Sequence, residues 1–188
     1  MNLIIFGPPG AGKGTQSNFI VKKYNLFQLS TGEILREQIR DKTDLGKKIS
    51  PVINSGLFVS DDIVSELIEK IIKDKNYYNR IIFDGYPRSL SQASNLDVLL
   101  KTYNQKIDLV LKLSVSLDTV IKRISERRIL EKREDDNEKI AIKRYKTYEK
   151  STEPVIEYYK KLNLLKVING ERSIDQINKE ISDIINLI

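Results

Sequence analysis

A glycine-rich stretch near the N-terminus constrains this chain more than any other feature. Residues 6–15 read FGPPGAGKGT, and they lie between an apolar run, 3–6, and a run with helical character, 16–24. A buried strand, a tight turn and a helix N-terminus in that order direct backbone N–H groups and the positive end of the helix dipole at an anion, and Lys13 adds a positive charge. The stretch therefore predicts a site for the phosphates of a nucleotide.

The same stretch departs from the usual phosphate-loop pattern at one position. The spacing G-x-x-x-x-G-K is met by Gly7, Gly12 and Lys13, but Gly14 follows where Ser or Thr is usual, and the hydroxyl comes one residue later, at Thr15. This displacement weakens the expectation that Thr15 ligates Mg²⁺. The alternative, a glycine-rich turn that only joins a strand to a helix, is less favoured because strand, loop and helix all occur in the required order.

The composition excludes several kinds of chemistry. The chain of 188 residues has no cysteine and no histidine, which excludes disulfides, a thiolate nucleophile, cysteine-ligated zinc and imidazole catalysis. Its length, with 40% hydrophobic and 31% charged residues, predicts one soluble globular domain. Met1 leads almost directly into the first apolar run, and no run of about 18 apolar residues suggests a membrane span. We therefore expect a cytoplasmic protein without a signal peptide or a membrane partner.

The net charge of +6 admits nucleic acid as a partner. The lysines are scattered along the chain rather than arranged in a stripe, which favours a surface excess of lysine together with arginines that face small phosphates. We therefore expect small-molecule partners and no nucleic acid.

Short apolar runs alternate with helical patterns over the whole chain. The expected strands are 3–6, 26–29, 80–83, 107–113 and 164–168. The expected helices are 13–24, 31–40, 61–73, 90–103, 117–127, 138–161 and 174–186. This alternation predicts an α/β fold in which a parallel sheet is flanked by helices on both faces.

Two stretches interrupt the alternation. Residues 30–59 carry two helical pieces with no strand between them, and residues 127–137 are nearly all charged. Neither stretch looks like core, so we expect two small mobile flaps inserted into a core of 1–29, 60–126 and 138–188. The alternative for the second stretch is a solvated charged loop.

Several helix starts carry capping signatures, in which a serine is followed three residues later by Glu or Gln. They are Ser30 with Glu33, Ser89 with Gln92, and Ser173 with Gln176. Pro51 falls in the second helical piece of 30–59, where a missing N–H and the restricted Ser50 predict a kink or a restarted helix.

Further motifs follow the glycine-rich stretch in order. They are LSTGEILR at 29–36, DGYPRSLSQ at 84–92, R-x₅-R-E-D-D-N at 127–137, then Arg144 and Y-x₃-T-E-P at 148–154. Together, and along the whole chain, these motifs resemble the adenylate kinases, a family of nucleoside monophosphate kinases. The short stretch between Arg127 and Asp136 resembles the short-lid subtype, which has no zinc-binding lid.

The resemblance implies the reaction ATP + AMP ⇌ 2 ADP, with Mg²⁺ accompanying ATP and without zinc. Phosphoryl transfer requires charge neutralisation and in-line placement of the two nucleotides, so the absence of histidine and cysteine is no handicap. The residues implied for ATP are Gly10, Ala11, Gly12, Lys13, Gly14, Thr15, Arg127 and Arg172. The residues implied to be catalytic are Lys13, Arg88, Arg123, Arg133 and Arg144. Planar guanidinium groups suit the bidentate grip on phosphate that this chemistry needs.

By the same resemblance, the AMP site takes in residues of the first flap, of the DGYPR motif and two later arginines. They are Thr31, Arg36, Leu57, Phe58, Val59, Gly85, Tyr86, Pro87, Arg88, Gln92, Arg133 and Arg144. Gln92 has two competing roles, contact with the AMP base and the capping box. Asp84 is the acidic candidate for Mg²⁺, through water, because this ion keeps much of its hydration; a structural role at the end of a strand is its alternative.

Three points remain open at this level. Asp135 and Asp136 either latch a closed lid onto arginines or cap the helix from 138. The enzyme could instead take UMP or CMP as the acceptor. In a different class, a non-catalytic phosphate-loop protein could hold nucleic acid. We expect a monomer.

Overall fold

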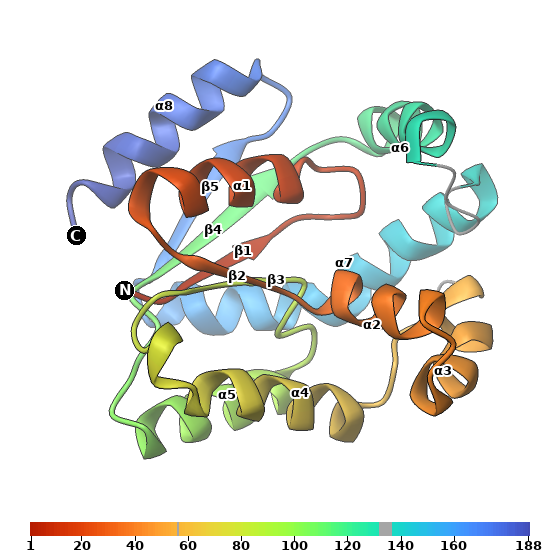
Figure 1. The fold of residues 1–188 in the computed structure, drawn as a ribbon. Helices are drawn as coiled ribbons and strands as arrows, with labels where there is room; N and C mark the ends of the chain where they lie inside the picture. The colour runs from red at the N-terminus through yellow and green to blue at the C-terminus, as the bar shows by residue number, and fades with distance from the viewer. Residues whose placement is uncertain (56, 132–136) are drawn as a thin grey trace.

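Five parallel strands form a sheet at the centre of the computed structural model, which describes residues 1–55, 57–131 and 137–188 (Figure 1). The strands are β1 (Leu3–Phe6), β2 (Phe27–Ser30), β3 (Ile81–Asp84), β4 (Leu109–Ser114) and β5 (Leu165–Asn169), in the order β2-β3-β1-β4-β5. β1 pairs with β3 on one side and with β4 on the other. Ligands of open α/β sheets bind at the carboxyl ends of the strands beside such a switch point, so the sheet order places a site after β1.

Helices cover both faces of the sheet. They are α1 (Lys13–Tyr24), α2 (Thr31–Arg40), α3 (Asp44–Asn54), α4 (Asp61–Lys73), α5 (Leu90–Thr102), α6 (Leu117–Glu131), α7 (Glu138–Lys161) and α8 (Ile174–Ile185), with a short 3₁₀ turn at Lys75–Tyr77. The predicted α/β fold is confirmed, and the predicted strands and helices agree with the structure to within two residues except at the end of α6. That helix runs to Glu131, four residues beyond the predicted end at 127.

The alternation of side chains along β1 divides the core in two. Leu3 and Ile5 pack with residues of α1, α6 and α8, whereas Ile4 and Phe6 pack with residues of α4, α5 and α7. All of these strand residues are fully or almost fully buried. Successive side chains of a strand point to opposite faces, so a run that is apolar throughout requires cover on both sides. Figure 1 shows these two helical layers, with α2 and α3 beyond the edge of the sheet.

The predicted helix caps have mixed outcomes. Ser173 and Gln176 form the full capping box. Ser89 accepts a hydrogen bond from the backbone N–H of Gln92, but the side chain of Gln92 is used elsewhere. The box predicted at Ser30 is wrong: Ser30 is the N-cap residue of α2, but its hydroxyl makes no capping bond within the described chain.

Two further expectations concern helix boundaries. Helix α3 continues through Pro51, so the helix does not restart there; the proline is exposed, and its ring interrupts a single backbone hydrogen bond. Asn137 caps α7, where its side chain accepts a hydrogen bond of 2.9 Å from the N–H of Ile140. The alternative that Asp135 or Asp136 caps this helix is therefore not needed, and both lie outside the described residues. Among the described helices, none is long and apolar enough to cross a membrane.

Candidate active site

A cavity of about 730 Å³ opens at the carboxyl edge of the sheet, next to the switch point after β1. A smaller cavity of about 70 Å³ adjoins it on the side of α2 and shares Phe58, Gly85 and Arg88 with it. Every site residue predicted from the sequence lines one or both of these cavities, except Arg133, which lies outside the described residues.

The glycine-rich loop forms one wall of the larger cavity. Gly10 and Gly12 have φ of 79° and 92°, in the left-handed region that favours glycine. A Cβ atom at Gly10 would also lie 3.1 Å from the side chain of Ile124, so the loop passes close to α6. Gly12 is the N-cap of α1, and no side chain of the described residues caps the amides of the first turn. Those amides are thus available to an anion.

Lys13 lies at the centre of this wall. Its Nζ donates hydrogen bonds to the carbonyl oxygens of Gly7 at 2.8 Å and Pro8 at 3.1 Å. The pKa of Lys13 is lowered to about 8, mainly by burial; Asp84 opposes this change, and the nearby Arg88 and Arg144 contribute to it. Such an ammonium group favours a bound anion, because the anion would stabilise the positive charge and raise the lowered pKa.

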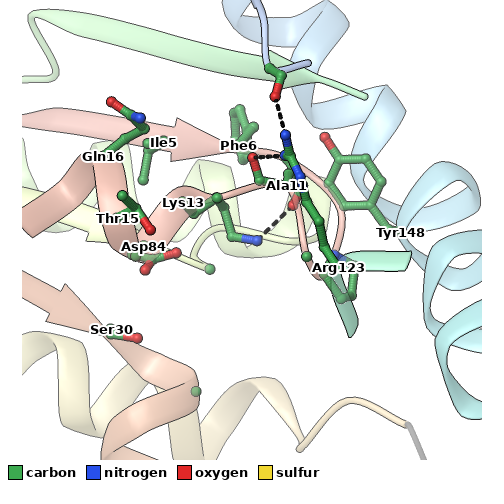
Figure 2. Close-up of a pocket in the computed structure, with 18 of the residues that line it drawn as sticks. Ile5, Phe6, Ala11, Lys13, Thr15, Gln16, Ser30, Asp84, Arg123 and Tyr148 are labelled. Carbon is green, nitrogen blue, oxygen red and sulfur yellow. Dashed lines mark hydrogen bonds between the residues drawn. The ribbon is translucent and has the colours of Figure 1, made fainter. Parts of the chain in front are cut away.

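Arginines from separate elements surround the same cavity. Six of the predicted ones line it: Arg36 of α2, Arg88 of the β3–α5 loop, Arg123 and Arg127 of α6, Arg144 of α7, and Arg172 between β5 and α8. Figure 2 shows Arg123 facing the space that Lys13 and Asp84 also border. This excess of cations around one cavity suits a polyanionic ligand.

Backbone contacts hold two of these guanidinium groups in place. Arg123 donates to the carbonyl of Gly170 at 2.9 Å (Figure 2). Arg88 donates through Nε to the carbonyl of Gly85 at 2.6 Å, and its guanidinium carbon lies 4.6 Å from the centre of the Phe58 ring. Burial and the neighbouring Arg144 lower the pKa of Arg88 to about 10. Both groups are therefore positioned before any ligand arrives.

The smaller cavity contains the other residues predicted for the AMP site. Its lining includes Thr31, Leu57, Phe58, Val59, Gly85, Tyr86 and Gln92. The Thr31 hydroxyl donates to the carbonyl of Gly85 at 3.1 Å, which ties α2 to the DGYPR turn. Tyr86 is 2% exposed and belongs to the core, so its ring supports the cavity from behind. Pro87 lines the larger cavity, after a cis peptide bond.

Asp84 ends β3 at the floor of the larger cavity. It is buried, and its Oδ2 accepts a hydrogen bond of 3.0 Å from Nε2 of Gln28 on the neighbouring strand. The hydroxyls of Thr15 and Ser30 line the same cavity, so the donors present are oxygen atoms, which suit Mg²⁺. Within the described residues, no three acidic, histidine or cysteine side chains gather in a group that could hold a metal ion. The residues therefore fit an ion bound mainly through phosphate and water.

Comparison with known proteins identifies the family. A sequence model described as "Adenylate kinase" matches residues 5–164. The chain is 46% identical to an adenylate kinase of Pelagibacter ubique over the full length of both chains. It is 44% identical to one of Azobacteroides pseudotrichonymphae, with 96% of this chain and 95% of the relative covered, and 36% identical to one of Petrotoga mobilis, with 98% and 97% covered. The chain belongs to the adenylate kinase family.

Family membership makes the chain a nucleotide-binding phosphotransferase, in agreement with its α/β fold. Arg127 and Arg172, which the sequence predicts for ATP, both line the larger cavity. Arg172 donates to Glu180 of α8 at 3.0 Å, so its side chain is engaged by a neighbouring helix.

Sequence reasoning missed several residues of this adenylate kinase site. Tyr148 and Thr152 line the larger cavity, and their buried hydroxyls have no hydrogen-bond partner among the described residues. Both belong to the Y-x₃-T-E-P motif, which contributed to the family resemblance, but the sequence analysis assigned neither residue a function. Gln28 and Asp61 contact Asp84 and Gln92, and nothing in the sequence around them indicates these contacts.

Proposed function

We propose that the chain catalyses the reversible reaction ATP + AMP ⇌ 2 ADP. One observation carries the proposal: Lys13 and six arginines from five separate parts of the fold line a cavity at the N-terminus of α1. Two nucleotides brought end to end present several negative charges, and such a set of cations offsets their repulsion.

Each group has a role in the proposed reaction. Lys13 and the first-turn amides of α1 bind the donor phosphates. Arg36 and Arg88 bind the phosphate of AMP. Arg123 and Arg144, with Arg133, surround the group in transfer. The oxygen that attacks belongs to the AMP phosphate, so the protein needs only to align it with the donor and to neutralise charge.

The metal and the flaps complete the proposal. When Mg²⁺ is bound with ATP it neutralises charge on the donor phosphates, and Asp84 would hold it through water. Residues 30–59 and the lid, 127–137, of which 132–136 lie outside the described residues, would close over the nucleotides and exclude water, which would prevent hydrolysis of ATP. The position of α2 and α3 beyond the sheet, in contact mainly with each other, supports a separate first flap (Figure 1). We further propose that the enzyme acts as a monomer.

A coupled assay of ADP formation from ATP and AMP tests the proposal. We expect Lys13→Ala and Arg88→Ala each to lower turnover about 10³-fold or more, by analogy with other arginines that stabilise phosphoryl transfer. Arg80→Ala is the matched control, because Arg80 is exposed and donates to Asn25, away from both cavities. Normal activity of Arg88→Ala would contradict the proposed AMP site.

The same assay separates the remaining alternatives. With UMP or CMP in place of AMP, turnover above that with AMP would identify a pyrimidine nucleotide kinase. Salt-dependent binding of polynucleotide without ADP formation would identify a nucleic-acid-binding protein.

A further inference from the structure

Asp61 connects the end of the first flap to the start of α5. It is the first residue of α4, and it accepts hydrogen bonds from three side chains of the β3–α5 region. Ser91 Oγ lies 2.7 Å from Oδ2, Ser89 Oγ 3.3 Å from the same oxygen, and Gln92 Nε2 2.6 Å from Oδ1. An acidic residue in the first helical turn interacts with the helix dipole without such contacts. The dipole therefore does not explain the three side-chain hydrogen bonds to Asp61.

Gln92 is the partner that matters, because it lines the smaller cavity and is only 4% exposed. Its Nε2 donates to Asp61, and its Oε1 accepts a 2.7 Å hydrogen bond from the backbone N–H of Arg88. A carboxylate only accepts and a backbone N–H only donates. Rotating the amide by a half-turn would place two acceptors together at Asp61 and two donors together at Arg88. Asp61 and Arg88 thus hold the amide in one orientation.

The Gln92 amide, held in this orientation, can still form two hydrogen bonds with a ligand. Nε2 carries a second hydrogen, and Oε1 has a second lone pair. Adenine matches this pair, because its N1 accepts and its amino group at C6 donates. Hypoxanthine and guanine present the reverse pattern, with a hydrogen on N1 and a carbonyl oxygen at C6, and would match only the rotated amide.

We propose that Asp61 is a positioning residue that orients Gln92 so that the smaller cavity accepts AMP and rejects 6-oxopurine monophosphates. This inference rests on the proposed function, in which the smaller cavity binds the base of the acceptor. Asp61 acts through Gln92 and does not itself touch the nucleotide.

Three variants test the inference by steady-state kinetics with ATP, AMP and IMP. Asp61→Ala removes the acceptor for Nε2, and we expect the KM for AMP to rise about tenfold and the preference for AMP over IMP in kcat/KM to fall about tenfold, the effect of about one hydrogen bond. The KM for ATP should stay within about twofold. Asp61→Asn keeps an oxygen acceptor and can donate to the serine hydroxyls, so it should restore AMP preference to within about threefold of wild type.

Asp62→Ala is the matched control. Asp62 follows in the same first turn and is exposed, so its loss removes the same charge from the same helix end without touching Gln92. An Asp61→Ala enzyme that changes the KM values of ATP and AMP equally, or that keeps the wild-type preference for AMP over IMP, would overturn the inference. Wild-type protein that makes no ADP from AMP would instead contradict the proposed function, so the two failures are distinguishable.

A measurement on the wild-type protein covers the case in which Asp61→Ala does not fold. NMR hydrogen exchange should show one side-chain amide proton of Gln92 exchanging at least about tenfold more slowly than those of Gln176. Gln176 is a fitting reference, because its Oε1 accepts a hydrogen bond from Ser173 while its Nε2 lies in an exposed cap. Equal exchange rates would show that Asp61 does not hold the amide.

Discussion

At the residue scale, Lys13 combines a requirement of function with a loss of stability. Its ammonium group is withdrawn from water and surrounded by arginines, and its pKa falls from 10.5 to about 8. The group therefore binds its proton less tightly in the folded protein than in the unfolded chain. A phosphate in the adjacent loop would reverse that change, so the free protein is destabilised at the position where it binds its ligand.

We expect Lys13→Met to abolish activity and to raise the free energy of unfolding at pH 7 by at most about 3 kcal/mol, the equivalent of the lowered pKa. In the wild type, the unfolded chain binds more protons than the folded protein between pH 8 and 10.5, so stability rises with pH across that window. The difference in free energy of unfolding between Lys13→Met and the wild type should therefore shrink as the pH rises from about 8 and disappear near 10.5. Urea unfolding of both proteins over this pH range measures the difference. A difference that stays constant with pH would contradict the lowered pKa of Lys13.

At the element scale, the first flap depends on backbone contact between two helices. Gly46 in the first turn of α3 is buried, and a Cβ atom there would lie 1.9 Å from the carbonyl oxygen of Gln38. Thr43 caps α3 by accepting a 3.0 Å hydrogen bond from the N–H of Gly46 and also bonds Gln38. The turn between α2 and α3 is therefore held by atoms of the backbone, which cannot move aside as a flexible side chain can.

Gly46→Ala should lower the free energy of unfolding by about 1–3 kcal/mol, the usual effect of overpacking, and should raise the KM for AMP more than that for ATP. Gly14→Ala is the control for stability alone: a Cβ atom there meets nothing within 4 Å, and alanine in a helix gains about 0.5–1 kcal/mol over glycine. Thermal and urea unfolding measure both variants. Equal free energies of unfolding for Gly46→Ala and Gly14→Ala would show that α2 and α3 can move apart to accommodate the added methyl group without loss of stability.

Across the fold as a whole, the larger cavity gathers positive charge that suits a polyanionic ligand. The chain carries a net charge of +6, and seven cationic side chains of the proposed site, Lys13 and six arginines, line one cavity. Their mutual repulsion should lower the free energy of unfolding of the ligand-free protein. A bound polyphosphate should then raise this free energy strongly.

A linked ATP–AMP mimic should therefore stabilise the protein by about 2.7 kcal/mol when present at 100 times its Kd. Adenosine, which lacks the phosphates, should give little stabilisation at the same concentration. Raising the ionic strength should reduce the gain by screening the charges. Differential scanning calorimetry with each ligand measures these shifts, and equal stabilisation by adenosine would indicate that the bases rather than the phosphates dominate binding.

The sequence predicted those parts of the site that are short and continuous. The glycine-rich loop, the boundary of α1 and the DGYPR turn each lie within about a dozen residues, so spacing and local preference describe them well. The residues that hold these parts in place were missed. Gln28 contacts Asp84 across two strands, and Asp61 contacts Gln92 from 31 residues away.

The α/β alternation, the glycine-rich loop and membership in the adenylate kinase family can be predicted from the chain alone, because each depends on the order of its residues. Which side chains meet depends on the three-dimensional fold. The order β2-β3-β1-β4-β5 places Arg123 within 3.4 Å of the carbonyl of Ala11, 112 residues earlier. Contacts of this kind depend on how the strands are ordered and how the helices pack over them, and no local pattern encodes that arrangement.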